Sequence, residues 1–116
     1  MKYGLSDKDL DLITRVCAVP AEIEQAILFG SRAKGNYKRG SDVDLALKGD
    51  GVNKETVSLL SGILNEGLPL PYYFDVLRYD SIRDEKLKAD IDRVGVVIFE
   101  RLAAPNQTST EDAANA

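Results

Sequence analysis

The chain has 116 residues, of which 44% are hydrophobic, so we expect one globular domain. Its formal net charge of −4 argues against strong binding to nucleic acid, and its lack of histidine excludes a Ser-His-Asp triad and any imidazole metal ligand. Because Cys17 is the only cysteine and no apolar run approaches the roughly 18 residues that span a membrane, we expect a cytoplasmic protein without a disulfide or membrane association.

The first predicted element is a helix between Ser6 and Pro20. Apolar residues fall three and four apart from Leu10 to Cys17, which is the spacing of one helical face. Ser6 can cap this helix at its start, and Pro20 is expected to end it. Cys17 lies on the apolar stripe, so we expect a thiol packed in the core.

An apolar run over residues 26–29 predicts the first strand, and the run ends at Gly30-Ser31. Ser31 is a good N-cap residue for a short helix that Gly35 should break. Glycine allows close approach to the backbone, and a helix N-terminus attracts phosphate oxygens. The turn can be an ordinary helix cap or a phosphate contact.

Residues 42–47 predict a second strand that carries Asp42 and Asp44 on one side. Paired carboxylates repel each other and need a proton or a cation nearby. Hard oxygen ligands next to a phosphate suit Mg²⁺. The alternative is that both acids lie on a solvated strand edge.

Later residues continue the alternation of helices and strands. Asn53 should cap a second long helix, and residues 72–77 predict a third strand that contains Asp75. A last helix is expected to open at residues 82–84, and residues 96–99 predict a fourth strand.

Such alternation predicts a mixed α/β (α+β) fold, in which about four strands form a sheet flanked by helices. We expect residues 1–102 to form this domain. Residues 103–116 contain no large apolar side chain, so we expect a disordered C-terminal tail.

The combination of Gly30-Ser31, ten residues, and Asp42-Val43-Asp44 resembles the signature of the DNA polymerase β nucleotidyltransferase superfamily. The pattern is most similar to its minimal nucleotidyltransferases (MNT type), which resemble the catalytic domain of kanamycin nucleotidyltransferase. The superfamily uses a third carboxylate on a later strand, and Asp75 lies where that residue should be. The resemblance implies a mixed sheet of the polymerase β palm type.

The resemblance also implies a reaction, the transfer of a nucleoside monophosphate, AMP from ATP, to a hydroxyl acceptor. The catalytic residues would be Asp42, Asp44 and Asp75, which would hold two Mg²⁺ ions. Gly30 and Ser31 would bind the outer phosphates of the nucleotide. Without metal, we expect the three acids to titrate as a coupled group with at least one raised pKa.

Two basic residues follow the Gly-Ser turn and are candidates for contact with the triphosphate. Arg32 and Lys34 lie within reach of Ser31 in an otherwise acidic chain. They can equally belong to a solvated basic loop.

Kanamycin-type enzymes have a second, helical region for the acceptor, and this chain is expected to be too short for one. Its acceptor would then come from another protein or another copy. The resemblance implies a HEPN-type helical toxin as partner, this chain as its antitoxin, and a tyrosine of the toxin as acceptor. Two alternatives remain, a non-catalytic antitoxin that acts by complex formation and an enzyme for a small hydroxylated molecule such as an aminoglycoside.

Overall fold

Four strands form one mixed sheet in the order β3-β2-β1-β4. A computed structural model describes residues 1–102 of the chain. Its elements in chain order are α1 (Asp7–Cys17), β1 (Gln25–Phe29), α2 (Ser31–Lys34), β2 (Val43–Lys48), α3 (Lys54–Glu66), β3 (Phe74–Arg78), the short 3-10 helix η1 (Tyr79–Ser81), α4 (Glu85–Val94) and β4 (Val96–Glu100). The expected fold class is therefore confirmed.

Local capping explains where the long helices begin. The Ser6 hydroxyl accepts a hydrogen bond from the Asp9 N–H at 3.0 Å, as predicted for the start of α1. Asn53 starts α3 with a reciprocal capping box, in which its side chain accepts from the Thr56 N–H and the Thr56 hydroxyl accepts from the Asn53 N–H. Asp84 caps α4 in a similar way.

Strand β2 lies between β1 and β3, so its residues are paired with a strand on each side. It pairs with β1 antiparallel and with β3 parallel. Asp44 is consequently opposite Phe29 on one side and opposite Asp75 on the other. Segments that are separated in sequence thus bring the Gly-Ser turn and two acids to neighbouring positions.

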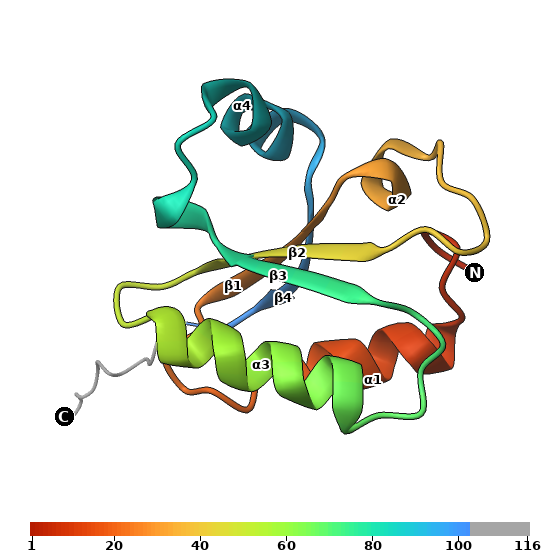
Figure 1. Ribbon diagram of the computed structural model, residues 1–116, viewed down its shortest axis with the longest axis horizontal. Coiled ribbons are helices and arrows are strands. Elements are labelled where there is room, and N and C mark those ends of the chain that lie inside the picture. The colour runs from red at the N-terminus through yellow and green to blue at the C-terminus, as the bar shows by residue number, and fades with distance from the viewer. Residues whose placement is uncertain (103–116) are drawn as a thin grey trace, which may run out of the picture.

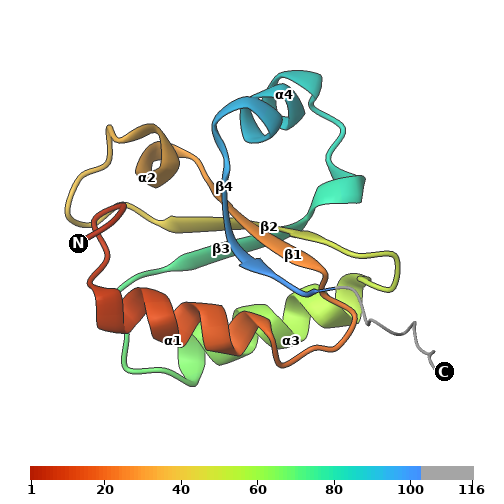
Figure 2. The ribbon, with the colours of Figure 1, turned by 180° about the vertical axis from the view of Figure 1, so that it is seen from behind.

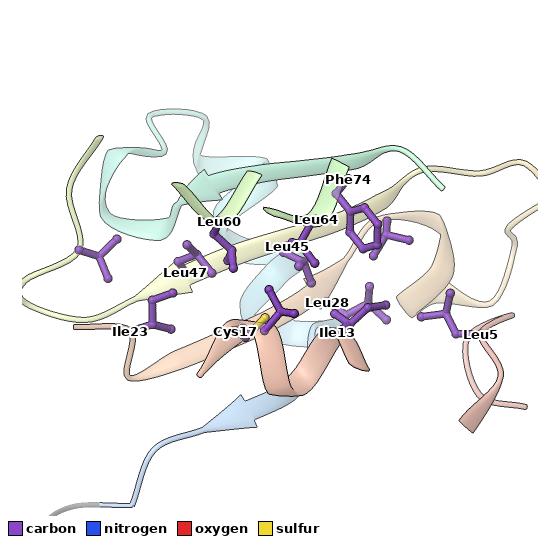
Figure 3. Packing of buried hydrophobic residues seen from close by; sticks show 14 residues of the cluster. Leu5, Ile13, Cys17, Ile23, Leu28, Leu45, Leu47, Leu60, Leu64 and Phe74 are labelled. Carbon is purple, nitrogen blue, oxygen red and sulfur yellow. The ribbon is translucent and has the colours of Figure 1, made fainter. Parts of the chain in front are cut away.

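Helices α1 and α3 cover one face of the sheet (Figure 1) and lie side by side when the molecule is seen from behind (Figure 2). The alternate β2 residues Val43, Leu45 and Leu47 point toward these helices and are fully buried. Cys17 lies in the same cluster (Figure 3), and burial raises the pKa of its thiol to about 12. The predicted core thiol is confirmed.

The opposite face of the sheet carries α2 and α4 (Figure 1). A smaller apolar cluster lies there, formed by Ile27, Phe29, Ala46 and Ile91. Asp44 and Asp75 belong to this face because they alternate with the buried residues of the other one. This face is therefore apolar toward α4 and acidic toward α2.

Element boundaries differ from the sequence prediction in a few places. Strand β2 begins at Val43, so Asp42 lies just before it. The 3-10 helix at Tyr79–Ser81 was not predicted, and α4 begins at Glu85 rather than at residues 82–84. Residues 103–116, the predicted tail, lie outside the described residues. No helix between residues 1 and 102 is long and apolar enough to cross a membrane.

Candidate nucleotide and metal site

The turn after β1 is built around Gly30. Gly30, not the predicted Ser31, is the N-cap of α2, and Ser31 is the first helical residue. The backbone angles of Gly30, φ 75° and ψ −154°, belong to a region that is almost restricted to glycine. The chain therefore makes its turn into α2 at Gly30, where glycine accepts these angles, and the helix starts one residue later at Ser31. The first N–H groups of the short helix have no partners within the helix itself.

Gly30 lies directly against the carboxylate of Asp44. A Cβ atom added at Gly30 would overlap Asp44 Oδ2. The glycine therefore gives the space in which the Asp44 carboxylate lies next to the turn. The structure brings together these two elements of the sequence motif, which are fourteen positions apart.

The three predicted acids influence one another. Partial burial of Asp44 is the main cause that raises its pKa to about 6, and the negative charges of Asp75 and then Asp42 add to this rise. The positive charge of Arg32 acts in the opposite direction. The expectation that at least one acid of this group has a raised pKa is confirmed.

The acids differ in exposure, since Asp44 is half-buried whereas Asp42 and Asp75 are exposed. Within residues 1–102, no three His, Cys, Asp or Glu side chains are spaced to hold a metal ion by themselves. Protein Mg²⁺ sites commonly use one or two carboxylates and let substrate phosphates and water complete the octahedron. Asp44 is half-buried with a raised pKa, and its register partner Asp75 is exposed. This arrangement fits a site that the substrate completes, and it does not fit a preformed set of three protein ligands.

Arg32 lies in a different environment from the one predicted. Its side chain is only 1% exposed, and its guanidinium donates to the carbonyls of Tyr3 (2.9 Å) and Ser41 (2.8 Å from Nη2). The rings of Tyr37 and Tyr72 lie over the guanidinium at 5.5 and 4.9 Å. With its donors used inside the chain, Arg32 cannot reach a triphosphate as placed. It holds the carbonyl of the residue just before Asp42.

Lys34 is exposed, as expected for a candidate phosphate ligand, but it has a partner. Its ammonium group lies 3.0 Å from the Asp90 carboxylate, which also pairs with Arg93 at 2.7 Å. This ion pair joins α2 to α4 across the acidic face of the sheet. It could not be predicted from residue spacing, because Lys34 and Asp90 are 56 positions apart in the chain.

These observations agree with a comparison of the sequence with known families. The model of the polymerase beta nucleotidyltransferase family matches residues 11–103. The chain belongs to this family. It therefore has a nucleotidyltransferase domain, and the resemblance seen in the Gly-Ser and double-aspartate motif is confirmed.

Three solved structures share this fold. A toxin–antitoxin crystallised with AMP-PNP has a TM-score of 0.62 and 20% identity over 84% of this chain and 75% of that chain. A mutant of the toxin–antitoxin MntA–HpeT with two Asp-to-Glu changes two residues apart has a TM-score of 0.60 and 17% identity, covering 84% of this chain and 75% of the other. A second MntA–HpeT mutant, with a Tyr-to-Ala change, has a TM-score of 0.60 and 19% identity, covering 84% and 74%.

At these identities the structures establish the fold alone. No curated protein matches the sequence, so the similarity to kanamycin nucleotidyltransferase stays a prediction.

Proposed function

We propose that this chain transfers AMP from Mg²⁺-bound ATP to a tyrosine hydroxyl of a HEPN-type helical toxin, and thereby acts as its antitoxin. The observation that carries the proposal is the contact between Gly30 and the Asp44 carboxylate, with Asp75 in register beside it. A phosphate-binding turn and carboxylates at one place are what phosphoryl transfer requires.

In the proposed reaction the acceptor oxygen attacks the α-phosphorus, and the bond from that phosphorus to the bridging oxygen of the β-phosphate breaks. Pyrophosphate leaves with the bond electrons. Asp75, the exposed acid on β3, receives or orients the hydroxyl proton of the acceptor. Gly30 and Ser31 would hold the outer phosphates through backbone N–H groups and the Ser31 hydroxyl.

Mg²⁺ is the cation that the donor set fits, because all candidate ligands are carboxylate oxygens. Asp42, Asp44 and Asp75 would hold the metal together with the nucleotide. When bound, Mg²⁺ neutralises phosphate charge and so lowers the barrier to displacement. Burial and the negative charges of Asp75 and Asp42 raise the pKa of Asp44 and so disfavour its ionised form, which a bound cation would stabilise.

The antitoxin part of the proposal is supported by the fold neighbours, which are toxin–antitoxin structures, one of them with AMP-PNP. The proposed partner is a helical protein that supplies the acceptor.

The test is to incubate the full chain with labelled ATP, Mg²⁺ and the protein encoded by the neighbouring gene. We expect label on a tyrosine of that protein, and loss of labelling with Asp75→Asn while the complex still forms. Asp80→Asn, an exposed acid on η1, is the matched control and should label normally. Neutralisation by Asp75→Asn without label would instead indicate an antitoxin that acts by binding alone. Label on a small hydroxylated molecule only would indicate the third alternative.

A further inference from the structure

A groove of about 1320 Å³ lies between α3 and β3, and Asp42, Asp44 and Asp75 are not among the residues that line it. Val76 and Leu77, which point to opposite faces of β3, both line it, together with residues along α3 such as Val57, Ser61 and Gly62. The groove therefore opens on the edge of the sheet itself. Since β3 is one of the two edge strands of the sheet (Figure 1), its outer backbone groups have no neighbouring strand.

One side chain already covers part of this edge. The Phe74 N–H donates to Asn65 Oδ1 at 2.7 Å, and Asn65 Nδ2 donates to the Phe74 carbonyl at 3.0 Å. The Asn65 amide thus pairs with Phe74 as a neighbouring strand would. It also fixes the direction in which the backbone groups of β3 point.

The remainder of the edge is open. The Tyr73 carbonyl accepts from Val43 on the β2 side, whereas the Phe74 groups point outward. By strand alternation the N–H and C=O groups of Val76 and Arg78 also point outward. No hydrogen bond within the described residues reaches them from that side.

Arg78, which lines the groove, has an unpaired donor. Its Nε is the one buried side-chain nitrogen or oxygen atom within residues 1–102 that lacks a hydrogen-bond partner. Its Nη1 donates to the Ser81 hydroxyl at 3.3 Å. A buried N–H without an acceptor is costly, and a carboxylate is the strongest acceptor for a guanidinium. Near Arg78 the groove therefore favours an occupant with an acidic group, whereas its other charged lining residues are Lys54 and the acids Asp50 and Glu66.

Gly62 lines the groove on the side formed by α3, opposite β3. It lies inside α3, where glycine weakens a helix relative to alanine. A Cβ atom added there would meet no heavy atom within 4 Å, so packing within the chain does not require glycine. The space above Gly62 is part of the groove and is free for an external backbone.

We propose that this groove binds an extended segment of a partner protein, which adds as a strand to β3 at Val76–Arg78 and places an acidic side chain against Arg78. Pairing through an exposed strand edge is a general mode of peptide recognition. At about 3.3 Å per residue, a segment of about six residues would match the roughly 20 Å length of α3. Docking of this segment at β3 does not require nucleotide transfer.

A second copy of this chain is a poorer occupant. Antiparallel pairing of two β3 strands about Leu77 would place Val76 of one copy opposite Arg78 of the other. Such a pair leaves the Arg78 donor without a carboxylate. The favoured occupant is therefore an acidic segment of a different protein.

The test uses a capped peptide, Thr-Val-Glu-Val-Thr-Val, titrated into the isotope-labelled full chain and followed by NMR. We expect saturable shifts of the Val76 and Arg78 amides and slower hydrogen exchange at both. The peptide with Gln in place of Glu should bind at least tenfold more weakly. Absence of saturable shifts at millimolar peptide, or shifts only at the acids Asp42 and Asp44, would overturn the proposal.

Variants separate docking from folding. Gly62→Phe should fill the groove and weaken peptide binding at least tenfold without lowering Tm, since it adds side chain into open space. Leu59→Phe, on an exposed position of α3 outside the groove, is the control and should bind normally. Arg78→Gln removes the charge and the guanidinium donors, so it should abolish the preference for Glu over Gln. Normal binding by Gly62→Phe would contradict the groove as the docking site.

Discussion

The two faces of the sheet are built from the same strands but differ in burial and in charge. On the face covered by α1 and α3, the residues of β2 are apolar and fully buried, as with Leu45. On the other face the next residue along, Asp44, is half-buried and repelled by neighbouring acids. One face therefore stabilises the fold, whereas the other holds a half-buried carboxylate whose ionised form is disfavoured, at the place where we propose that the ligand binds.

The largest effect on stability should follow from a change on the covered face. Leu45→Ala removes a side chain with no solvent exposure, so we expect a loss of about 2–5 kcal/mol in the free energy of unfolding. Leu77→Ala, on the acidic face and only partly buried, is the matched control and should cost clearly less. Urea denaturation measures both. Equal losses would contradict the division of the two faces.

A substitution at the turn should have the next largest effect. Gly30→Ala combines a backbone conformation that disfavours side chains with overlap on the Asp44 carboxylate, and we expect a cost of about 1–3 kcal/mol. Gly35→Ala shares a positive φ of 85° but meets nothing within 4 Å, so it should cost less. Thermal unfolding of both variants gives the comparison. If Gly35→Ala were the more damaging, contact with Asp44 would not be the cause.

Removal of the strained charge should stabilise the protein. Because the folded state raises the pKa of Asp44 from 3.8 to about 6, ionised Asp44 disfavours folding, and this penalty appears as pH rises through 6. Asp44→Asn should therefore gain about 1–2 kcal/mol at neutral pH, after allowance for solvent screening. The gain should shrink between pH 6 and 3.8 and vanish below. A variant less stable than wild type at pH 7.5 in denaturant titrations would contradict this expectation.

The smallest effect on stability is expected at the ion pair between α2 and α4. Lys34→Ala breaks an exposed pair, so Tm should stay within experimental error of wild type. If Lys34 also contacts the triphosphate, this variant should bind Mg²⁺-ATP more weakly, whereas Arg93→Ala, which removes the other partner of Asp90, should not. Equal affinities of both variants for Mg²⁺-ATP would show that Lys34 makes the ion pair with Asp90 and does not contact the triphosphate.

Sequence patterns predicted those parts of the molecule that depend on short-range spacing. The acids at 42 and 44, the Gly-Ser turn and the caps of α1 and α3 are all local signals. The buried position of Arg32 was not predictable, because its acceptors are backbone carbonyls that carry no residue signature. The two hydrogen bonds between the Asn65 side chain and the Phe74 backbone were not predictable for the same reason.

The strand order also could not be predicted from the sequence. Alternating helices and strands are compatible with several arrangements, and Asp75 lies beside Asp44 only because β2 and β3 are neighbours in this register. The short helix η1 at the end of β3 has no apolar period and was missed. The family resemblance, and not residue spacing, predicted that Asp75 belongs with Asp44, and the two residues are register partners on β3 and β2.

The most direct test of the central claim is calorimetric titration of Mg²⁺-ATP into wild type, the double variant Asp42→Asn plus Asp44→Asn, and the control Asp80→Asn. We predict saturable heat for wild type and for the control, and none for the double variant, because we propose that Asp42 and Asp44 hold the metal–nucleotide complex. Equal heats from the wild type and the double variant would contradict the assignment of this site.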